Sequence, residues 1–270
     1  MSDDTLPQGI DHLWPRVKPL IGMVHLLPLP GSPRWRGSMD DVVARALADA
    51  EALGSGGMDG ILVENFLDAP FFAEVVPPET VAAMARVVAA VVQISPVPVG
   101  VNVLRNDARS ALGIAVATGA SFIRVNVHTG VMWTDQGRIR GRAAHTLRQR
   151  AALDSHVAIL ADVLVKHATP PPGLTPEQAA ADTWVRGLAD ALVVTGSGTG
   201  RPTELEELAE VLRGAPTAPI LSGSGVTPEN VGAVLAVADG AIVGTSLTRE
   251  GRAGSGVDLE KVRALVSARP

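Results

Sequence analysis

The sequence predicts a closed (β/α)₈ barrel, on three observations. Eight short apolar runs rich in Val and Ile recur along the chain, and a longer alanine-rich stretch with helical spacing follows each of them. The runs are continuously apolar, as strands buried on both faces of a parallel sheet must be. The length of 270 residues is typical of such a barrel. An open doubly wound sheet is the alternative, and it is disfavoured because no GxGxxG motif follows the first strand.

The expected elements alternate from the first strand to the last helix. Strands are expected at residues 20–24, 60–64, 97–103, 122–127, 157–163, 191–195, 219–223 and 241–245. Helices are expected near residues 39–54, 79–93, 107–118, 141–153, 175–188, 203–213, 227–236 and 258–267. Two of these helices begin with "TPEQ" and "TPEN", in which Thr can cap the helix, Pro takes its first position and Glu lies in its first turn. We expect one barrel domain over residues 19–270, preceded by a loosely ordered extension over residues 1–18.

The composition excludes several classes of function. The chain has no cysteine, so disulfides, thiolate nucleophiles and Cys-ligated metals are excluded, and any divalent metal would need His, Asp, Glu or Asn ligands. A net charge of −5 and an aromatic content of 3% argue against nucleic acid as a partner. The polar, acidic N-terminus lacks the pattern of a signal peptide, and there is no 18-residue uncharged apolar run. We expect a cytoplasmic protein without an integral membrane segment, and a homo-oligomer by analogy with barrels that pair through their outer helices.

Polar residues gather where the predicted strands end, which is where barrel enzymes carry their active sites. His25 ends the first strand and Glu64 the second. Arg124, Asn126 and His128 alternate on the fourth strand and should therefore share one face, for which the lumen is favoured over the apolar layer beneath the helices. The candidates for binding substrate in this region are Asn102, Arg105, Arg124, Asn126, His128 and His167.

The stretch "ILADVLVKHATPPPG" (159–173) carries the main catalytic candidates. Asp162 ends the fifth strand, and Lys166 and His167 follow at the mouth of the barrel. Lys166 is one of only three lysines in the chain. It can serve as a general acid, as a clamp on an oxyanion or phosphate, or as a Schiff-base nucleophile. The alternative is a loop lysine that forms an ion pair with Asp162, and the sequence leaves both interpretations open. The catalytic candidates are Asp162, Lys166, His25 and Glu64.

Glycine-rich turns after the last three strands predict a phosphate site. These turns are "TGSGTG" (195–200), "SGSGVTPEN" (222–230) and "GTSL" (244–247). Glycine lets backbone amides approach an anion, and phosphate sites in barrels are commonly built after strands seven and eight. Plain turn chemistry is the alternative. The phosphate-binding candidates are Gly223, Ser224, Gly225, Gly244, Thr245 and Ser246, and Thr195 and Ser197 are candidates for binding the rest of the substrate.

Two further patterns are less specific. His25, His128 and His167 could bind zinc or manganese together with Asp162 or Glu64, although no HxH or HExxH spacing supports such a site. The long loop "HTGVMWTDQGRIRG" (128–141) is either a lid that touches substrate anions or a solvated charge run, and solvation is favoured for Arg138 and Arg140.

Long segments in a consistent order resemble the BtpA family, which includes the SgcQ-type proteins. They are "KPLIGMVHLLPLPGSP" (18–33), "DGILVENFLDAPF" (59–71), "PVGVNVLRNDARSAL" (98–112), "FIRVNVHTGVMWTDQGRIRGRAAHTLRQR" (122–150), "ADVLVKHA" (161–168), "ADALVVTGSGTG" (189–200) and "SGSGVTPENV" (222–231). The resemblance implies a barrel of the ribulose-phosphate-binding kind. It implies no single activity, because one branch of the family is associated with photosystem I biogenesis and the other occurs among genes of sugar metabolism.

Three hypotheses follow from these observations. The first is an enzyme that acts on a phosphorylated sugar or a nucleoside-type glycoside by isomerisation, lyase chemistry or cleavage of a glycosidic bond. It is favoured because an assembly scaffold needs no convergent cluster of polar side chains. The second is a non-enzymatic assembly or stability factor, as in photosystem I biogenesis. The third is a metal-dependent hydrolase that uses His25, Asp162 and His167.

Overall fold

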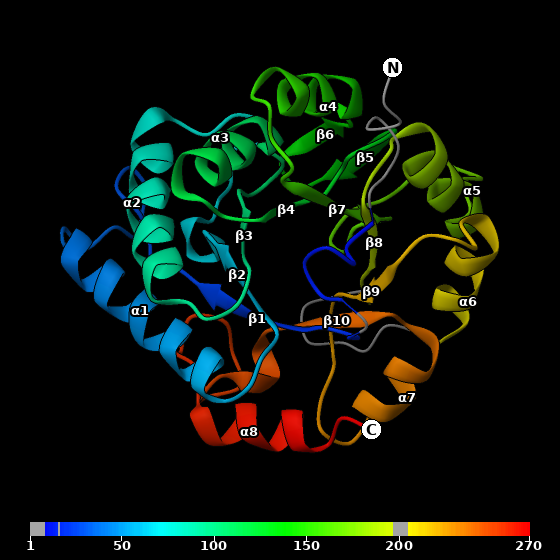
Figure 1. The fold of residues 1–270 in the computed structure, drawn as a ribbon. Coiled ribbons are helices and arrows are strands. Elements are labelled where there is room, and N and C mark those ends of the chain that lie inside the picture. Colours follow the sequence, from blue (N-terminus) through cyan, green and yellow to red (C-terminus); the bar gives the residue numbers. More distant parts are fainter. Residues whose placement is uncertain (1–8, 16, 197–204) are drawn as a thin grey trace.

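The computed structural model describes residues 9–15, 17–196 and 205–270, and it confirms the predicted (β/α)₈ barrel. Parallel strands close into a barrel in the order β1-β10-β9-β8-β7-β4-β3-β2, and the helices form a ring outside them (Figure 1). The barrel strands are β1 (Leu20–His25), β2 (Gly60–Glu64), β3 (Val99–Asn102), β4 (Phe122–Val125), β7 (Ala158–Val163), β8 (Ala191–Val194), β9 (Ile220–Ser222) and β10 (Gly240–Val243). The helices are α1 (Met39–Ser55), α2 (Pro78–Ile94), α3 (Ala108–Thr118), α4 (Ala143–Ala152), α5 (Pro176–Ala181), α6 (Leu205–Gly214), α7 (Val231–Val237) and α8 (Leu259–Ser267).

Side-chain caps explain where several helices begin. Thr175 caps α5 as predicted and forms a capping box with Gln178, and Asp107 caps α3 by accepting a hydrogen bond from the Ser110 amide at 2.9 Å. The second predicted start, "TPEN", is wrong. The Thr227 amide donates to Asn230 Oδ1 at 2.8 Å inside a turn, and α7 begins only after Asn230. Within this turn the Asn side chain competes with the helical backbone, as Asn side chains do in Asx-turns.

The lumen of the barrel holds a compact apolar layer below the mouth. Leu62, Phe122, Leu160 and Ile242 all belong to this layer and are buried. The Phe122 ring fills the space over Gly100 of β3. A Cβ added to Gly100 would lie only 2.1 Å from Phe122 Cε2. The layer therefore forms a solid floor under the mouth rather than a pore.

A segment before β1 closes the other end of the barrel. Ile10 and Trp14 are buried against the lumen layer, and the Trp14 ring meets the Phe122 ring edge-on with centroids 5.3 Å apart. Trp14 Nε1 also donates a hydrogen bond to the carbonyl oxygen of Asp59 at 2.6 Å. The expectation of a loosely ordered extension is therefore wrong for residues 10–14. We call this segment the plug.

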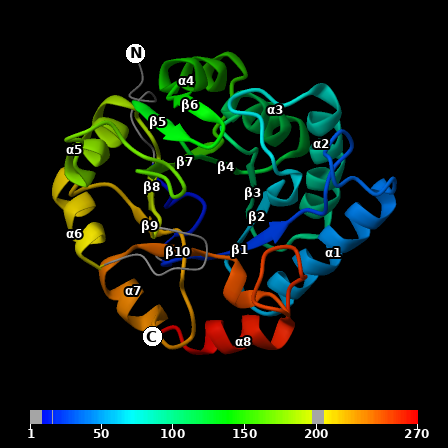
Figure 2. The ribbon, with the colours of Figure 1, turned by 180° about the vertical axis from the view of Figure 1, so that it is seen from behind.

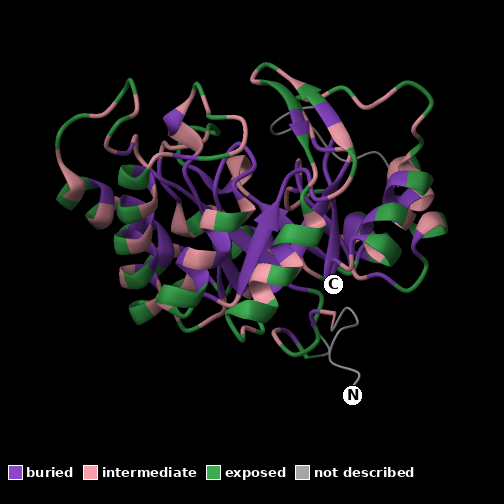
Figure 3. Ribbon diagram, turned by 90° about the horizontal axis from the view of Figure 1, so that it is seen from above, coloured by how far each residue is buried: buried purple, intermediate pink, exposed green. Residues whose placement is uncertain are grey.

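A β-hairpin rises from the opposite end of the barrel. Strands β5 (Val131–Thr134) and β6 (Gly137–Arg140) pair antiparallel where the sequence predicted an irregular loop. Met132 and Ile139 of the hairpin pack on Val165, and Trp133 exchanges two backbone hydrogen bonds with Thr169. The hairpin is therefore anchored on the loop that follows β7. Figure 2 shows it beside β7, and Figure 3 shows it at the end of the barrel away from the N-terminus. In the described part of the chain, no helix has the length and apolar character needed to cross a bilayer.

Candidate active site at the barrel mouth

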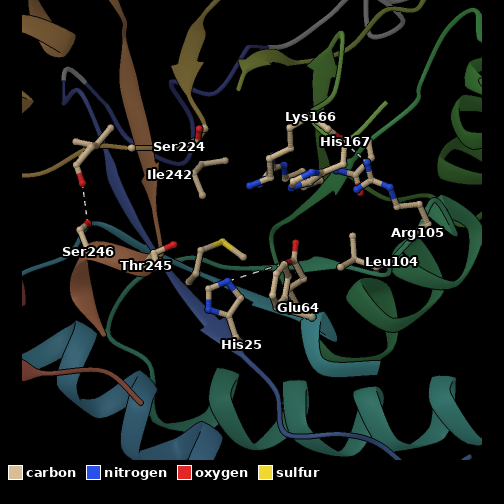
Figure 4. A pocket seen from close by; sticks show the side chains of 18 of the residues that line it. His25, Glu64, Leu104, Arg105, Lys166, His167, Ser224, Ile242, Thr245 and Ser246 are labelled. Atoms are coloured by element: carbon tan, nitrogen blue, oxygen red, sulfur yellow. Dashed lines mark hydrogen bonds and ion pairs between the residues drawn. The ribbon is translucent and has the colours of Figure 1, made fainter. Parts of the chain in front are cut away.

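A cavity of about 840 Å³ opens at the carboxyl ends of the barrel strands. Figure 4 shows Ser224, Thr245 and Ser246 on one side of this cavity and Arg105 on the other, with His25 and Glu64 between them. Its lining includes thirteen of the site candidates from the sequence: His25, Glu64, Arg105, Arg124, Asn126, Lys166, His167, Gly223, Ser224, Gly225, Gly244, Thr245 and Ser246. The strand ends that the fold brings together thus form one site.

The turns after β9 and β10 form one wall of the cavity, and all six phosphate-binding candidates lie on it. Ser246 Oγ donates to the carbonyl oxygen of Val226 at 2.7 Å and so ties the two turns together. The amides of Thr245 and Ser246 open a short 3₁₀ turn over Thr245–Leu247 and donate to no backbone carbonyl within the described ranges. Gly225 has a φ of +70°, a conformation that favours glycine. This wall therefore offers amide and hydroxyl donors to an anion.

Glu64 and His25 lie next to each other at the base of the cavity. Glu64 Oε1 is 4.0 Å from His25 Nε2, and Glu64 Oε2 accepts a hydrogen bond from Asn102 Nδ2 at 2.5 Å. The His25 ring packs edge-on against Phe66 with centroids 5.1 Å apart. Burial lowers the pKa of His25, and the Glu64 charge only partly opposes that effect. A neutral imidazole beside a carboxylate is suited to proton transfer. Asn102, a substrate-binding candidate, instead orients Glu64.

Lys166 reaches the cavity from the loop after β7. Its amide donates to Thr195 Oγ1 at 3.1 Å, and its carbonyl oxygen accepts from Arg105 Nη2 at 2.6 Å. Within the described ranges, no carboxylate lies within 4.0 Å of its amine. Burial lowers the pKa of Lys166, the Arg124 charge lowers it further, and Glu64 opposes both. Thr195, also a substrate-binding candidate, therefore positions the Lys166 backbone.

Asp162 is bound by Arg124 on β4 and by Asn126 just after β4, and the alternative ion pair between Lys166 and Asp162 does not form. Arg124 donates through Nε to Asp162 Oδ1 at 2.8 Å and through Nη2 to Oδ2 at 3.1 Å, and Asn126 Nδ2 donates to Oδ2 at 2.9 Å. Both carboxylate oxygens are thus occupied beneath the cavity lining. The geometry makes Asp162 a positioning residue for Arg124 and Asn126 rather than the acid or base that the sequence suggested. Asn126 Oδ1 is buried and has no hydrogen-bond partner among the described atoms.

Two other candidates lie away from the cavity or at its rim. His128 turns away, and its Nε2 donates to the carbonyl oxygen of Gly187 at 2.8 Å, so the substrate-binding role expected for it is not supported. The reason is that β4 ends at Val125, so the alternation that was to align His128 with Arg124 stops before it. His167 lies exposed at the rim. Ser197 lies outside the described residues.

The sequence reasoning missed the tip of the hairpin. Asp135 and Gln136 join β5 to β6 and line the cavity, so the hairpin forms part of its roof. The missed signal was Gly137, which has a φ of +96° and ends a tight turn between two short alternating runs. Arg138 and Arg140 are exposed, as the solvated interpretation expects, and Arg142 pairs with Glu74.

The donors proposed for a metal do not converge. Among residues 9–15, 17–196 and 205–270, no three His, Asp or Glu side chains are grouped so that they could hold a metal ion. Asp162 is already bound by Arg124 and Asn126, and His25 faces Glu64 instead. The residues present therefore do not fit the ligand set of His25, Asp162 and His167, and the hydrolase hypothesis loses its structural basis.

Comparison with known proteins agrees with the fold and indicates the family. The model of the BtpA family matches residues 16–269. The chain is 51% identical to the photosystem I biogenesis protein BtpA of Synechocystis over 93% of this chain and 87% of that protein. It is 32% identical to the putative sgc region protein SgcQ of Escherichia coli over 91% of each. Among solved structures, tryptophan synthase of Mycobacterium tuberculosis superposes with a TM-score of 0.59 at 18% identity, covering 93% of this chain and 91% of that one. Thiamine phosphate pyrophosphorylase of Pyrococcus furiosus gives 0.57 at 14%, covering 93% and 95%. At these identities the structures show a shared fold.

Proposed function

The chain belongs to the BtpA family, and we propose that its barrel mouth is the active site of an enzyme that acts on a phosphorylated sugar or a nucleoside-type glycoside. One observation carries the proposal. A single cavity places the open amides of Thr245 and Ser246, in the turn after β10, opposite a lysine that pairs with no carboxylate among the described residues, with a His–Glu pair at its base. A purely structural barrel has no use for this arrangement.

The wall formed by the turns after β9 and β10 supports phosphate binding. Its donors are the amides of Thr245 and Ser246 and the hydroxyl of Thr245, and its glycines let a ligand approach the backbone. β9 and β10 are the seventh and eighth strands of the barrel, after which barrels commonly bind phosphate. The side chains on this wall carry no negative charge that would repel an anion.

The rest of the cavity supports recognition and proton transfer on a hydroxylated substrate. Asn126 Oδ1 is a buried acceptor that still needs a donor, and a sugar hydroxyl can supply one. Glu64 and His25 can take and return a proton. Isomerisation, lyase chemistry and cleavage of a glycosidic bond all need such transfers, so the acid–base pair supports all three reaction classes.

Thermal denaturation with matched ligand pairs tests the proposal. The pairs are ribose 5-phosphate with ribose and adenosine monophosphate with adenosine. A ligand present at a hundredfold its Kd stabilises the fold by about 2.7 kcal/mol, a shift of several degrees for a chain of this size. We expect stabilisation by at least one phosphorylated member and a smaller effect from its unphosphorylated partner.

A variant that introduces a negative charge tests whether the stabilisation by phosphorylated ligands depends on this wall. Thr245→Asp places a carboxylate among the open amides and should abolish the shift in melting temperature. Ser267→Asp, at an exposed position of α8 that does not line the cavity, should leave the shift intact. A shift that survives Thr245→Asp would contradict the assignment of the phosphate to these turns.

A second candidate function rests on the 51% identical relative, whose name describes photosystem I biogenesis. An assembly factor acts by contacting partner proteins, and Phe72 and Val75 are exposed apolar side chains near the mouth. In that case Thr245→Asp would leave assembly activity unchanged and Phe72→Ser would weaken partner capture in a pulldown. The enzyme proposal makes the opposite prediction for Thr245→Asp.

A further inference from the structure

We propose that Lys166 forms an imine with the carbonyl carbon of its substrate, which makes that substrate a phosphorylated aldehyde or ketone. The inference deepens the proposed function and rests on it for the phosphate group. It rests on the position of Lys166, on the charges around it and on a contrast with the other two lysines of the chain.

The backbone holds Lys166 in one place at the cavity. Thr195 fixes its amide and Arg105 fixes its carbonyl oxygen, from two different barrel loops. On either side, Leu164 and His167 adopt positive φ values of 50° and 57°, which are uncommon for residues with side chains. Such conformations persist where the surrounding structure requires them, often at functional sites. The loop is built so that the Lys166 side chain extends into the cavity, as Figure 4 shows.

Burial of Lys166 favours the neutral amine, which is the nucleophilic form. The guanidinium groups of Arg124 and Arg105 favour it too, whereas the carboxylates of Glu64 and Asp162 oppose it. Arg124 and Asp162 form a bidentate pair, so their charges largely offset each other at the amine. The direction of the Lys166 pKa agrees with this geometry, since burial and Arg124 both lower it.

The other lysines show the opposite surroundings. Lys18 Nζ donates to the carbonyl oxygen of Leu235 at 2.6 Å. Lys261 Nζ donates to the carbonyl oxygens of Thr248 at 2.6 Å and Arg249 at 3.2 Å. Both amines are therefore held by backbone carbonyl oxygens and do not line the cavity, so these two residues serve as controls for Lys166.

The chemical step balances with groups already in the cavity. The Nζ lone pair attacks the carbonyl carbon and the C=O π electrons move to oxygen. That oxygen takes a proton and the nitrogen loses one, which gives a neutral carbinolamine. A second proton on the oxygen lets it leave as water while the nitrogen lone pair forms the C=N bond. The net reaction joins amine, carbonyl and one proton into an iminium ion and water, and hydrolysis reverses it. Glu64 and His25 can donate and recover the protons.

Borohydride trapping with pyridoxal 5′-phosphate tests the inference. This probe is an aldehyde that carries a phosphate, and reduction converts its imine to a stable amine that peptide mass mapping locates. Each unit by which a lysine pKa falls raises the free-amine fraction about tenfold at neutral pH. We expect Lys166 to be labelled several-fold faster than Lys18 and Lys261, and inorganic phosphate to slow its labelling. Lys166→Arg should lose this label and keep the slow labelling of the other two.

Equal or slower labelling of Lys166 would overturn the inference. Reductive ¹³C-methylation gives an independent measurement, because the NMR resonances of only three lysines have to be followed through a pH titration. A Lys166 resonance that titrates together with that of Lys18 would also overturn it. The two proposals fail separately. Stabilisation by sugar phosphates without preferential labelling removes the imine alone, whereas labelling by pyridoxal that needs no phosphate, with no stabilisation by any phosphorylated ligand, removes the phosphate site.

Discussion

Replacing Asp162 with Asn should strongly destabilise the fold, because it removes the charge partner of Arg124. The side chains of Arg124 and Asp162 are only 4% and 0% exposed, so water cannot solvate the guanidinium left behind. The new amide also turns a donor toward Arg124 or Asn126, both of which already donate to this position. Two unfavourable effects therefore act together at one buried site.

The size of the loss follows from the burial of the pair. Removing one partner of a buried ion pair costs about 3–5 kcal/mol. At roughly 2–4 °C per kcal/mol for chains near this size, the melting temperature should fall by roughly 6–20 °C. The exposed pair of Arg86 and Asp40 provides a matched control, with a separation of 2.6 Å and side chains 54% and 88% exposed. Asp40→Asn should cost about 0–1 kcal/mol.

Urea denaturation of the two single variants and one double variant measures this difference. The double variant Arg124→Leu with Asp162→Leu removes both charges and fills the space, so it should recover part of the stability that Asp162→Asn loses. The recovery is partial because the buried amide of Asn126 loses its acceptor on Asp162. If Asp162→Asn were as stable as Asp40→Asn, the Arg124–Asp162 pair would not be the buried contact described above, and Asp162 would again be available as an acid or base.

Two further predictions concern stability. Lys166→Met should raise the melting temperature at neutral pH. The folded pKa of Lys166 lies below its ordinary 10.5, so the unfolded chain binds more protons between the two values. The advantage should therefore shrink as the pH rises through this window and vanish above it, and a constant difference across a pH series would contradict the reasoning. Trp14→Ala should lower the free energy of unfolding measured with urea by about 3–5 kcal/mol, because it empties a buried aromatic site and removes the hydrogen bond to Asp59. A near-neutral result would show that the plug contributes little to stability.

Most of the fold could be predicted because buried parallel strands have a simple signature. The run "GILVE" matches β2 at both ends, and the other barrel strands begin or end within a few residues of expectation. The plug was missed because Ile10 and Trp14 are isolated apolar residues in a polar segment, and no local pattern shows that the barrel floor will cover them. The hairpin was missed because its arginines suggested a solvated loop, and its two strands are too short for a clear alternating pattern.

The sequence predicted where the candidate residues would lie but not which of them would contact each other. The rule that polar residues at strand ends meet at the mouth placed Glu64 and Lys166 there, and both line the cavity. It could not show that Asp162 would bind Arg124, because that contact depends on register. Arg124 lies opposite Leu160 in the β4–β7 ladder, and Asp162 is two residues further along. Register is set by the whole closed barrel, which a single sequence does not display.

The plug has a consequence for the order of folding. Ile10 and Trp14 are synthesised long before Ile242 of β10, although Ile242 belongs to the floor that they cover. Contacts between segments so distant in sequence form late, because the chain between them must first be ordered. A nascent chain therefore carries these apolar residues uncovered while all the strands from β1 to β10 are made, a state that favours aggregation or chaperone binding. We expect that closure of β10 against β1 ends this exposure and seals the barrel from below in the same step.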